Sequence, residues 1–573
     1  MYCRVIACDF DGTGAADGKL APEVASSLHR ARLAGIITLL VTGRVLEDFR
    51  VALVDFSAFD AVVAENGAVI WFPERELNIE LGPTPPEHFL GRLRAAGIPF
   101  KAGAVVIGTW EGHATQSLAL IRESGLDLQL VFNRAALMLL PSGVDKAVGV
   151  RRALLELGRS ERNMIAFGDA ENDLPLFALA ELAVAARDSV PAVAAIADEQ
   201  LSRPGAEGVA HYVDTVVDAG CRAPSPARRR IALGRASDGT VVSLPLGERN
   251  VLVSGDPRTG KSWLAGLVAE RLLEAGYRFC ILDPEGDHHS LAERTGCALL
   301  GQLLHLPKPR DLPTVLADLQ TSLVVSLTSL LQDAKVAYVC AALEALAGER
   351  ERSGLPNWII VDEAHYFFHD GAGCCAESLA RTGNVLLTSY RPSLLSAATL
   401  DSIGAYLLQR TEVDSERYFI EGLLGARGPQ DRHAVEMLDE LQPNRTGLIL
   451  ATATGPRWQT FAPDARISQH VHHGRKYVEG GVPPGKAFRF TVPDDGVAAS
   501  AQTVPEFADA IRTVPLESLR RHMLAGDFSR WSREVLGDPG LASGLAKLER
   551  TTSLGGQPNR DEIIGHLRDR YVL

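Results

Sequence analysis

Apolar and polar positions alternate along the first 220 residues in blocks of two lengths. The short blocks are apolar runs of the length of a buried strand, at 4–9, 36–42, 60–65 and 163–168. The longer blocks have the length of helices, at 24–34 and 148–158. Strands that alternate with helices are typical of a parallel α/β sheet. The pattern predicts an α/β domain over residues 1–220, with ligands beyond the carboxyl ends of its strands.

Residues from about 80 to 140 have a pattern of their own inside this domain. Two amphipathic helices ("PEHFLGRLRAAGIPF" and "ATQSLALIRESGL") are interleaved with three strands ("GAVVIG", "DLQLVFN" and "ALMLLP"). The pattern predicts a small α/β insert. Four polar residues of the insert either face a ligand or belong to its solvated surface: Arg92, Lys101, Asn133 and Arg134.

The rest of the chain divides into three further segments. Residues 221–230 ("CRAPSPARRR") predict a linker, whose run of three arginines at 228–230 provides solubility or contacts phosphate or nucleic acid. Residues 231–465 again contain apolar strands that end in polar residues, and they predict a second α/β domain. Residues 466–573 predict a small, mostly helical domain of unknown function, with two capped helices between 503 and 538. We expect Phe528 and Trp531 to lie in its core.

Length, composition and charge narrow the class of protein. A chain of 573 residues is too long for one core and predicts about two to four domains. No apolar run approaches the roughly 18 residues that span a bilayer, and no signal peptide is evident, so we expect a cytoplasmic protein with reduced cysteines and no membrane partner. The net charge of −13 argues against a broad nucleic-acid surface, although a local basic groove stays open.

Polar residues of a few chemical types follow the predicted strands of the first domain. "VIACDFDGT" places Asp9 and Asp11 two positions apart, where two carboxylates on one side of a strand repel each other unless a cation lies between them. Three further strand or helix ends carry a hydroxyl, a lysine and an acidic loop that suits Mg²⁺: Thr42 with Gly43 and Arg44, Lys146, and Asp169 with Asn172 and Asp173.

In this order, D-x-D-G-T, V-T-G-R, a lysine at a helix start and G-D-x-x-N-D resemble the haloacid dehalogenase (HAD) superfamily of phosphatases. The phrase "AENGAVIW" at 64–71 is similar to its sugar-phosphatase, Cof-type branch. The resemblance implies a Rossmann-like core and a small α/β cap at about 80–140. It also implies a Mg²⁺-dependent phosphomonoester hydrolase that acts on a small phosphorylated metabolite.

The same resemblance implies roles for individual residues. Asp9 is the expected nucleophile and carries an aspartyl-phosphate, while Asp11 protonates the leaving alcohol and then activates water. Thr42 holds the phosphoryl group, and Lys146 neutralises charge between nucleophile and phosphate. The implied Mg²⁺ ligands, direct or through water, come from four aspartates: Asp9, Asp11, Asp169 and Asp173.

The second α/β domain contains a phosphate-binding loop. "NVLVSGDPRTGKSWLAGLVAERLLEAG" contains G-x-x-x-x-G-K-S between a strand and a helix, which predicts an ATP site. The ligand-contacting residues are Gly255, Gly260, Lys261, which reaches the β- and γ-phosphates, and Ser262, which binds Mg²⁺. In "NWIIVDEAHYFF", Asp362 supports Mg²⁺ and Glu363 activates water.

With "ILDPEGD" and "LLTSYRPS", these phrases resemble the HerA-like branch of the RecA-like P-loop ATPases, over residues 231–465. Tyr390 replaces a glutamine common in that branch, so Thr388 or Ser389 would serve as its sensor. Arg410 is either an arginine that acts across a subunit boundary or an ordinary surface residue. The resemblance makes a homo-oligomer one possible assembly of the protein. It keeps an alternative function open, an ATP-driven nucleic-acid translocase or defence-type machine with an accessory phosphatase.

Overall fold

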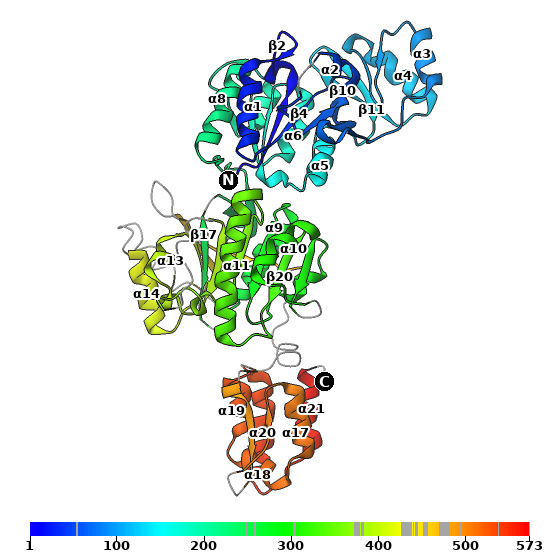
Figure 1. Ribbon diagram of the computed structural model, residues 1–573. Coiled ribbons are helices and arrows are strands. Elements are labelled where there is room, and N and C mark those ends of the chain that lie inside the picture. The colour runs from blue at the N-terminus through cyan, green and yellow to red at the C-terminus, as the bar shows by residue number, and fades with distance from the viewer. Residues whose placement is uncertain are drawn as a thin grey trace.

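The computed structural model shows three successive bodies along the chain (Figure 1). The described residues are 1–52, 56–247, 249–256, 259–301, 305–371, 379, 383–425, 438, 441, 445–450, 457–468, 482, 484–492, 496–536 and 538–571. Within these residues, no helix combines the length and the apolar composition that a bilayer crossing requires. Among the cysteines that the structure describes, five are free thiols and Cys340 is disulfide-bonded, so the expectation of reduced cysteines throughout is wrong.

The first body is an eight-stranded sheet with helices on both faces, in the order β14-β13-β12-β1-β4-β5-β6-β7. Its parallel strands are β1 (Val5–Asp9), β4 (Ile37–Val41), β5 (Ala61–Ala64), β12 (Met164–Gly168), β13 (Leu182–Ala185) and β14 (Glu199–Gln200). The antiparallel edge is β6 (Val69–Phe72) and β7 (Leu77–Glu80). The helices are α1 (Pro22–Leu33), α2 (Leu46–Ala52), α5 (Lys146–Glu156), α6 (Leu174–Leu179), α7 (Pro191–Ile196) and α8 (Gly205–Asp218). The prediction of a Rossmann-like α/β core is confirmed.

A small α/β layer projects from one side of this core, between β7 and α5 (Figure 1). Its antiparallel sheet has the order β10-β11-β9-β8. The strands are β8 (Lys101–Ala102), β9 (Ile107–Trp110), β10 (Leu128–Asn133) and β11 (Ala136–Pro141), and the helices are α3 (Glu87–Ala95) and α4 (Ala114–Ser124). The strand predicted at 103–108 begins only at Ile107, because the preceding amides bind a side chain of the core, as described below.

The second body contains an eleven-stranded mixed sheet, in the order β16-β15-β25-β24-β23-β17-β22-β21-β18-β20-β19. The parallel strands are β17 (Asn250–Ser254), β18 (Phe279–Asp283), β19 (Cys297–Leu300), β20 (Ser322–Ser326), β21 (Trp358–Val361), β22 (Val385–Ser389) and β23 (Ile403–Leu408). The antiparallel strands are β15 (Arg230–Arg235), β16 (Val241–Pro245), β24 (Thr446–Leu450) and β25 (Arg457–Pro463). Helices α9 (Lys261–Glu274), α10 (Leu312–Leu319), α11 (Gln332–Ser353), α13 (Ala397–Asp401) and α14 (Asp414–Gly425) accompany the sheet. Strand β22 lies between β17 and β21, so three polar strand ends meet.

The third body is a hairpin with helices. It contains β26 (Phe488–Thr491), β27 (Val497–Ala501), α17 (Val504–Thr513), α18 (Leu516–Leu524), α19 (Asp527–Glu534), α20 (Pro539–Ser553) and α21 (Arg560–Arg570). Three helices replace the two predicted between 503 and 538, because Gly526 adopts a left-handed conformation with φ of 68° and separates α18 from α19. Phe528 and Trp531 are buried in the aromatic core, as predicted.

Two arginines of the run 228–230 contact the first body, so the interpretation that they only provide solubility is wrong for these two. Arg228 and Arg229 donate hydrogen bonds to backbone carbonyls at the end of α6 in the first body. Neither phosphate nor nucleic acid is needed to explain them.

Candidate functional sites

The end of β1 and the end of β12 form a buried acidic pocket. Asp9 is the last residue of β1, Asp169 follows β12, and the two strands are parallel neighbours. With Asp173 they place carboxylate oxygens within 4.8 Å of one another, and all three side chains are buried. The structure thus brings together three of the four aspartates predicted to bind Mg²⁺. Asp11 is outside this cluster, and its role in metal binding stays a prediction.

Lys146 lies inside the pocket as the first residue of α5. The carboxylate of Asp145 caps this helix, accepting a hydrogen bond from the Val148 amide at 2.8 Å. Lys146 Nζ lies 2.5 Å from Asp9 Oδ1 and 2.5 Å from Asp173 Oδ1. Burial alone lowers a lysine pKa, but here the two carboxylates outweigh it and raise the pKa of Lys146 above its ordinary value. The lysine therefore stays charged.

One lysine does not neutralise the three carboxylates. Burial and repulsion from Asp173 raise the pKa of Asp9 well above its usual value. Burial also raises the pKa of Asp169, although Thr13 donates to Asp169 at 3.2 Å and Arg134 forms an ion pair with it. Three hard oxygen donors with excess negative charge fit a divalent cation such as Mg²⁺. Gly12 lines the pocket closely, since a Cβ there would lie 2.4 Å from Asp169 Oδ2.

Asp11 and Thr42 lie at the mouth of the pocket. Asp11 is exposed and accepts two hydrogen bonds from Arg44, from Nε at 2.9 Å and Nη2 at 2.6 Å. Thr42 is buried after β4, and its Oγ1 accepts the Arg44 amide at 3.1 Å. The sequence analysis quoted Arg44 within V-T-G-R without giving it a role. In the structure it holds the carboxylate that is expected to exchange protons with the leaving group.

A buried carboxylate ties the small α/β layer to the core. Glu65 accepts hydrogen bonds from the amides of Ala104, Val105 and Val106 at 2.9–3.0 Å. Gly103 has no room for a side chain, because a Cβ there would lie 2.5 Å from Glu65 Oε1. Glu65 lies in the phrase at 64–71, but that phrase shows no sign of this contact, because the partners lie about forty residues away.

The layer and the core enclose a cleft of about 450 Å³ beside the acidic pocket. Asp11 and Arg44 line it from the core, and Lys101, Trp110 and Asn133 line it from the layer. Of the four polar residues predicted from the insert, Lys101 and Asn133 face this cleft. Arg134 reaches the acidic pocket itself, and Arg92 instead pairs with Glu123 and Ser124 at the surface.

The predicted phosphate-binding loop of the second body joins β17 to α9. Gly255 and Gly260 both have positive φ, and Lys261 is the first residue of the helix. Pro257 and Arg258 lie outside the described residues. The buried ammonium of Lys261 donates to the Asp256 carbonyl at 2.8 Å, and burial lowers its pKa despite nearby Glu363 and Asp362. A charged, poorly solvated lysine at a helix start suits an anion.

Asp362 follows β21 and faces the start of α9. Its Oδ1 lies 3.5 Å from Ser262 Oγ, and it accepts a hydrogen bond from Thr388 Oγ1. His288 Nε2 lies 3.2 Å from its Oδ2. Burial opposes ionisation of Asp362, yet the contacts with His288, Thr388 and Ser262 lower its pKa below the usual value. The sequence analysis missed His288, although it quoted the phrase that precedes it.

Three further residues that the sequence predicted for this site have defined contacts in the structure. Thr388, rather than Ser389, reaches Asp362, and it accepts the Glu363 amide at 3.0 Å. Ser389 Oγ lies 3.4 Å from His365 Nδ1. Arg410 accepts the Asp256 amide with its carbonyl at 3.0 Å and pairs with Glu412 through its side chain. Its role across a subunit boundary stays a prediction.

Comparisons with known proteins concern the first body. Residues 130–213 match the family model of the haloacid dehalogenase-like hydrolases. The chain is 30% identical over 217 residues to a phosphoglycolate phosphatase of Methanothermobacter thermautotrophicus, a match that covers 37% of this chain and 97% of the relative. It is 29% identical over 234 residues to a phosphoglycolate phosphatase of Aeropyrum pernix, which covers 39% and 96%. A solved haloacid dehalogenase-like hydrolase from B. subtilis aligns at 18% identity over 37% of this chain and 99% of its own, with a TM-score of 0.33.

A capped α/β core with an acidic pocket at its strand ends defines a hydrolase of phosphate esters. The matches agree with that class, since nearly the full length of named phosphatases aligns with this chain. The chain belongs to the haloacid dehalogenase-like hydrolase family.

Proposed function

We propose that residues 1–220 form a Mg²⁺-dependent phosphomonoester hydrolase that acts through an aspartyl-phosphate on a small phosphorylated metabolite. The observation that carries the proposal is the acidic pocket, in which Lys146 Nζ lies 2.5 Å from Asp9 and Asp173. Asp9, Asp169 and Asp173 would hold Mg²⁺, which screens the charge between a carboxylate nucleophile and a phosphate dianion when it is bound.

The residues of the pocket divide the reaction between them. Asp9 attacks phosphorus, the bond from phosphorus to the alcohol oxygen breaks, and Asp11 gives that oxygen a proton. Asp11 then takes a proton from water, which attacks phosphorus and releases inorganic phosphate from Asp9. Lys146 and Thr42 bind the phosphoryl oxygens. Asp11 must leave Arg44 to reach the alcohol, so Arg44 becomes available to the substrate.

The named relatives make phosphoglycolate the first substrate to test. The cleft of about 450 Å³ lies within the range of pockets for larger ligands, and Trp110 and Phe100 give it an aromatic wall. Phosphorylated sugars therefore belong in the same panel, as the Cof-type resemblance implies.

The test is phosphate release from phosphoglycolate, phosphorylated sugars and nucleotides with Mg²⁺. We expect Asp9→Asn to abolish release from the preferred substrate. The matched control is Asp17→Asn, an exposed turn position with φ of 51° that asparagine tolerates. Release that is unchanged in Asp9→Asn refutes this site, and loss in both variants points to a folding defect.

A second activity is supported by the loop of the second body. We propose that residues 231–465 bind and hydrolyse ATP, with Lys261 on the phosphates, Ser262 and Asp362 on Mg²⁺, and Glu363 directing water. The supporting observation is the 3.5 Å approach of Ser262 Oγ to Asp362 Oδ1 at the helix start. Calorimetric titration with ADP tests it: Lys261→Ala should lose binding, and the exposed Lys308→Ala should keep it. Equal affinity in the two variants contradicts the assignment.

The alternative of an oligomeric, ATP-driven nucleic-acid translocase with an accessory phosphatase is not favoured, since the named relatives are phosphatases. Stimulation of ATP hydrolysis by DNA, together with a hexameric mass, would revive it. A phosphatase rate that does not change when DNA is added supports the first proposal.

A further inference from the structure

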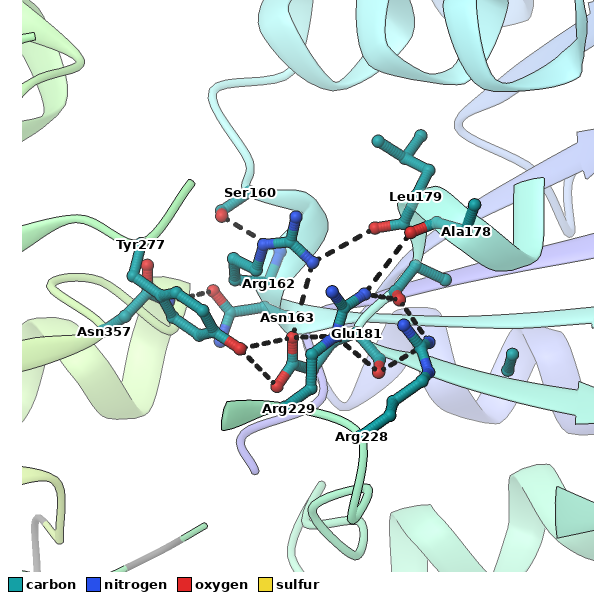
Figure 2. Close-up of polar contacts among 12 residues, drawn as sticks. Ser160, Arg162, Asn163, Ala178, Leu179, Glu181, Arg228, Arg229, Tyr277 and Asn357 are labelled. Atoms are coloured by element: carbon teal, nitrogen blue, oxygen red, sulfur yellow. Dashed lines mark hydrogen bonds and ion pairs between the residues drawn. The ribbon is translucent and has the colours of Figure 1, made fainter. Parts of the chain in front are cut away.

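The first and second bodies meet at a polar cluster around the buried Glu181, shown in Figure 2. We call the joint the set Arg162, Glu181, Arg228, Arg229 and Tyr277. Glu181 is only 2% exposed, and the Tyr277 hydroxyl, from the second body, lies 2.9 Å from both of its carboxylate oxygens and donates to them. Arg229 and Arg162 approach the same carboxylate at 3.2 and 3.6 Å. The arginines of the first body and of the connecting segment thus compensate the charge of Glu181, and the Tyr277 hydroxyl of the second body donates hydrogen bonds to it.

The three arginines of the joint also satisfy the end of α6. The last carbonyls of a helix lack partners within the helix, and cations stabilise that end. Arg162 donates to the Leu179 carbonyl at 3.3 Å, and Arg228 donates to Ala180 at 2.8 Å and to Phe177 at 3.3 Å. The position of α6 therefore depends on residues 228 and 229, which lead directly into the second body.

Two helices with functional residues at their starts end at this joint. Helix α6 begins directly after Asp173 of the acidic pocket, and Glu181 follows its end by two residues. Helix α9 begins at Lys261 of the phosphate-binding loop, and Tyr277 follows its end by three residues. A displacement at the start of either helix reaches the joint within one rigid element of at most about 21 Å, because a helix rises about 1.5 Å per residue.

Contacts beside the joint fix the angle between the bodies. Asn357 Nδ2 donates to Asn163 Oδ1 at 3.0 Å across the interface. Gly354 lies so close that a Cβ there would be 2.4 Å from Asn163. Gly276, in the turn after α9, packs against Arg162, since a Cβ there would lie 3.3 Å from Arg162 Nε. Polar groups buried in this way are stable only with their partners in place, so the docking is specific.

We propose that the joint couples the two sites, so that a nucleoside diphosphate bound at Lys261 changes the response of the acidic pocket to Mg²⁺. The proposal rests on both proposed functions. Bound phosphate moves the start of α9, Tyr277 moves against Glu181, and α6 carries the change to Asp173. Coupling free energies between sites correspond to about 5- to 150-fold changes in affinity. We expect ADP to shift the free Mg²⁺ concentration for half-maximal hydrolysis by about fivefold or more.

The experiment uses the full chain, p-nitrophenyl phosphate as the substrate and buffered free Mg²⁺, with and without ADP. Release of p-nitrophenol is read out, so phosphate from the nucleotide does not interfere. Tyr277→Phe should keep the basal rate and lose the ADP shift. The matched control is Tyr212→Phe, because the Tyr212 hydroxyl donates at 2.8 Å to Glu199 of the first body rather than to Glu181, and this variant should keep the shift. Lys261→Ala should lose it, which excludes binding of ADP in the phosphatase cleft.

Hydrogen–deuterium exchange over residues 168–181 gives a second readout that needs no phosphatase activity. ADP should change exchange there in the wild type and in Tyr212→Phe, but not in Tyr277→Phe. Arg228→Ala leaves Tyr277 intact and replaces Tyr277→Phe in the experiment if that variant fails to fold. It should also lose the exchange response to ADP. ADP binding without a change in exchange overturns the coupling alone. Absence of ADP binding overturns the coupling and the nucleotide site together, and absence of hydrolysis with a normal exchange response overturns only the phosphatase.

Discussion

Lys146 and Lys261 each begin a helix after a loop and each is buried, yet Lys146 contacts charged oxygens and Lys261 a neutral one. Lys146 Nζ lies between the carboxylates of Asp9 and Asp173, which raise its pKa. Lys261 Nζ donates to a backbone carbonyl, and burial lowers its pKa. The first lysine is already matched by negative charge, whereas the second is available to an incoming anion. The two proposed sites therefore differ in the charge that surrounds their lysines.

The aspartates show the same difference. Burial raises the pKa of Asp9 and of Asp169, so the first pocket holds more negative charge than its own cations balance. Asp362 instead has its pKa lowered by His288, Thr388 and Ser262, although burial opposes this. The carboxylates of the first pocket thus keep excess negative charge that suits a cation, whereas Asp362 is held ionised by its own protein partners.

The largest expected effect comes from one substitution made at both lysines. Lys146→Met leaves two buried carboxylates without their cation and should lower the free energy of unfolding by about 3–5 kcal/mol. Lys261→Met removes a charge that burial disfavours, so the free energy of unfolding should change by no more than about 1 kcal/mol. Urea unfolding without ligands measures both. Equal losses would show that the two lysines have the same electrostatic role and would break the comparison.

A ligand experiment sharpens the same contrast. Mg²⁺ alone should raise the unfolding temperature of the wild type and of Lys261→Ala, but not of Asp169→Asn. ADP with chelator should raise it in the wild type and in Asp169→Asn, but not in Lys261→Ala. At a ligand concentration one hundred times the dissociation constant, the stabilisation is about 2.7 kcal/mol. A response to Mg²⁺ that survives in Asp169→Asn would move the metal out of the acidic pocket.

Glu65 joins the cap to the core beside the first site. Glu65→Gln replaces one carboxylate oxygen by an amide donor that faces backbone N–H groups, so it should lower the free energy of unfolding by about 1–3 kcal/mol. The loosened cap should also raise KM for the phosphorylated substrate. Glu74→Gln is the control, because Glu74 is 73% exposed in its ion pair with Arg32. Identical behaviour of the two variants would mean that the Glu65 contact does not position the cap.

The sequence predicted the features of the fold that follow from a repeating pattern or from residues that are close together in the chain. Asp9 and Asp169 could be paired in advance, because the carboxyl ends of neighbouring parallel strands meet at one edge. Contacts between distant side chains have no periodic pattern, so the sequence could not reveal that Glu65 binds the amides of 104–106. Nor could it reveal that Tyr277 meets Glu181, 96 residues away. Arg228 and Arg229 looked like solvated linker residues because composition does not show which carbonyls lie nearby.

The smallest expected effects come from two exposed positions of the cap, the small α/β layer beside the first site. The two substitutions should differ in their effect on KM. Arg92 pairs with Glu123 at the surface, and exposed ion pairs contribute about 0–1 kcal/mol, so Arg92→Ala should leave kcat and KM within about twofold. Trp110 is 62% exposed but lines the cleft, and Trp110→Ala should raise KM while kcat stays nearly constant, because it removes contact with the bound alcohol rather than with the reacting phosphate. Steady-state kinetics on the preferred substrate measure both. Trp110 lines the cleft and Arg92 does not. An equal rise in KM for Arg92→Ala and Trp110→Ala would therefore place the bound alcohol outside the cleft.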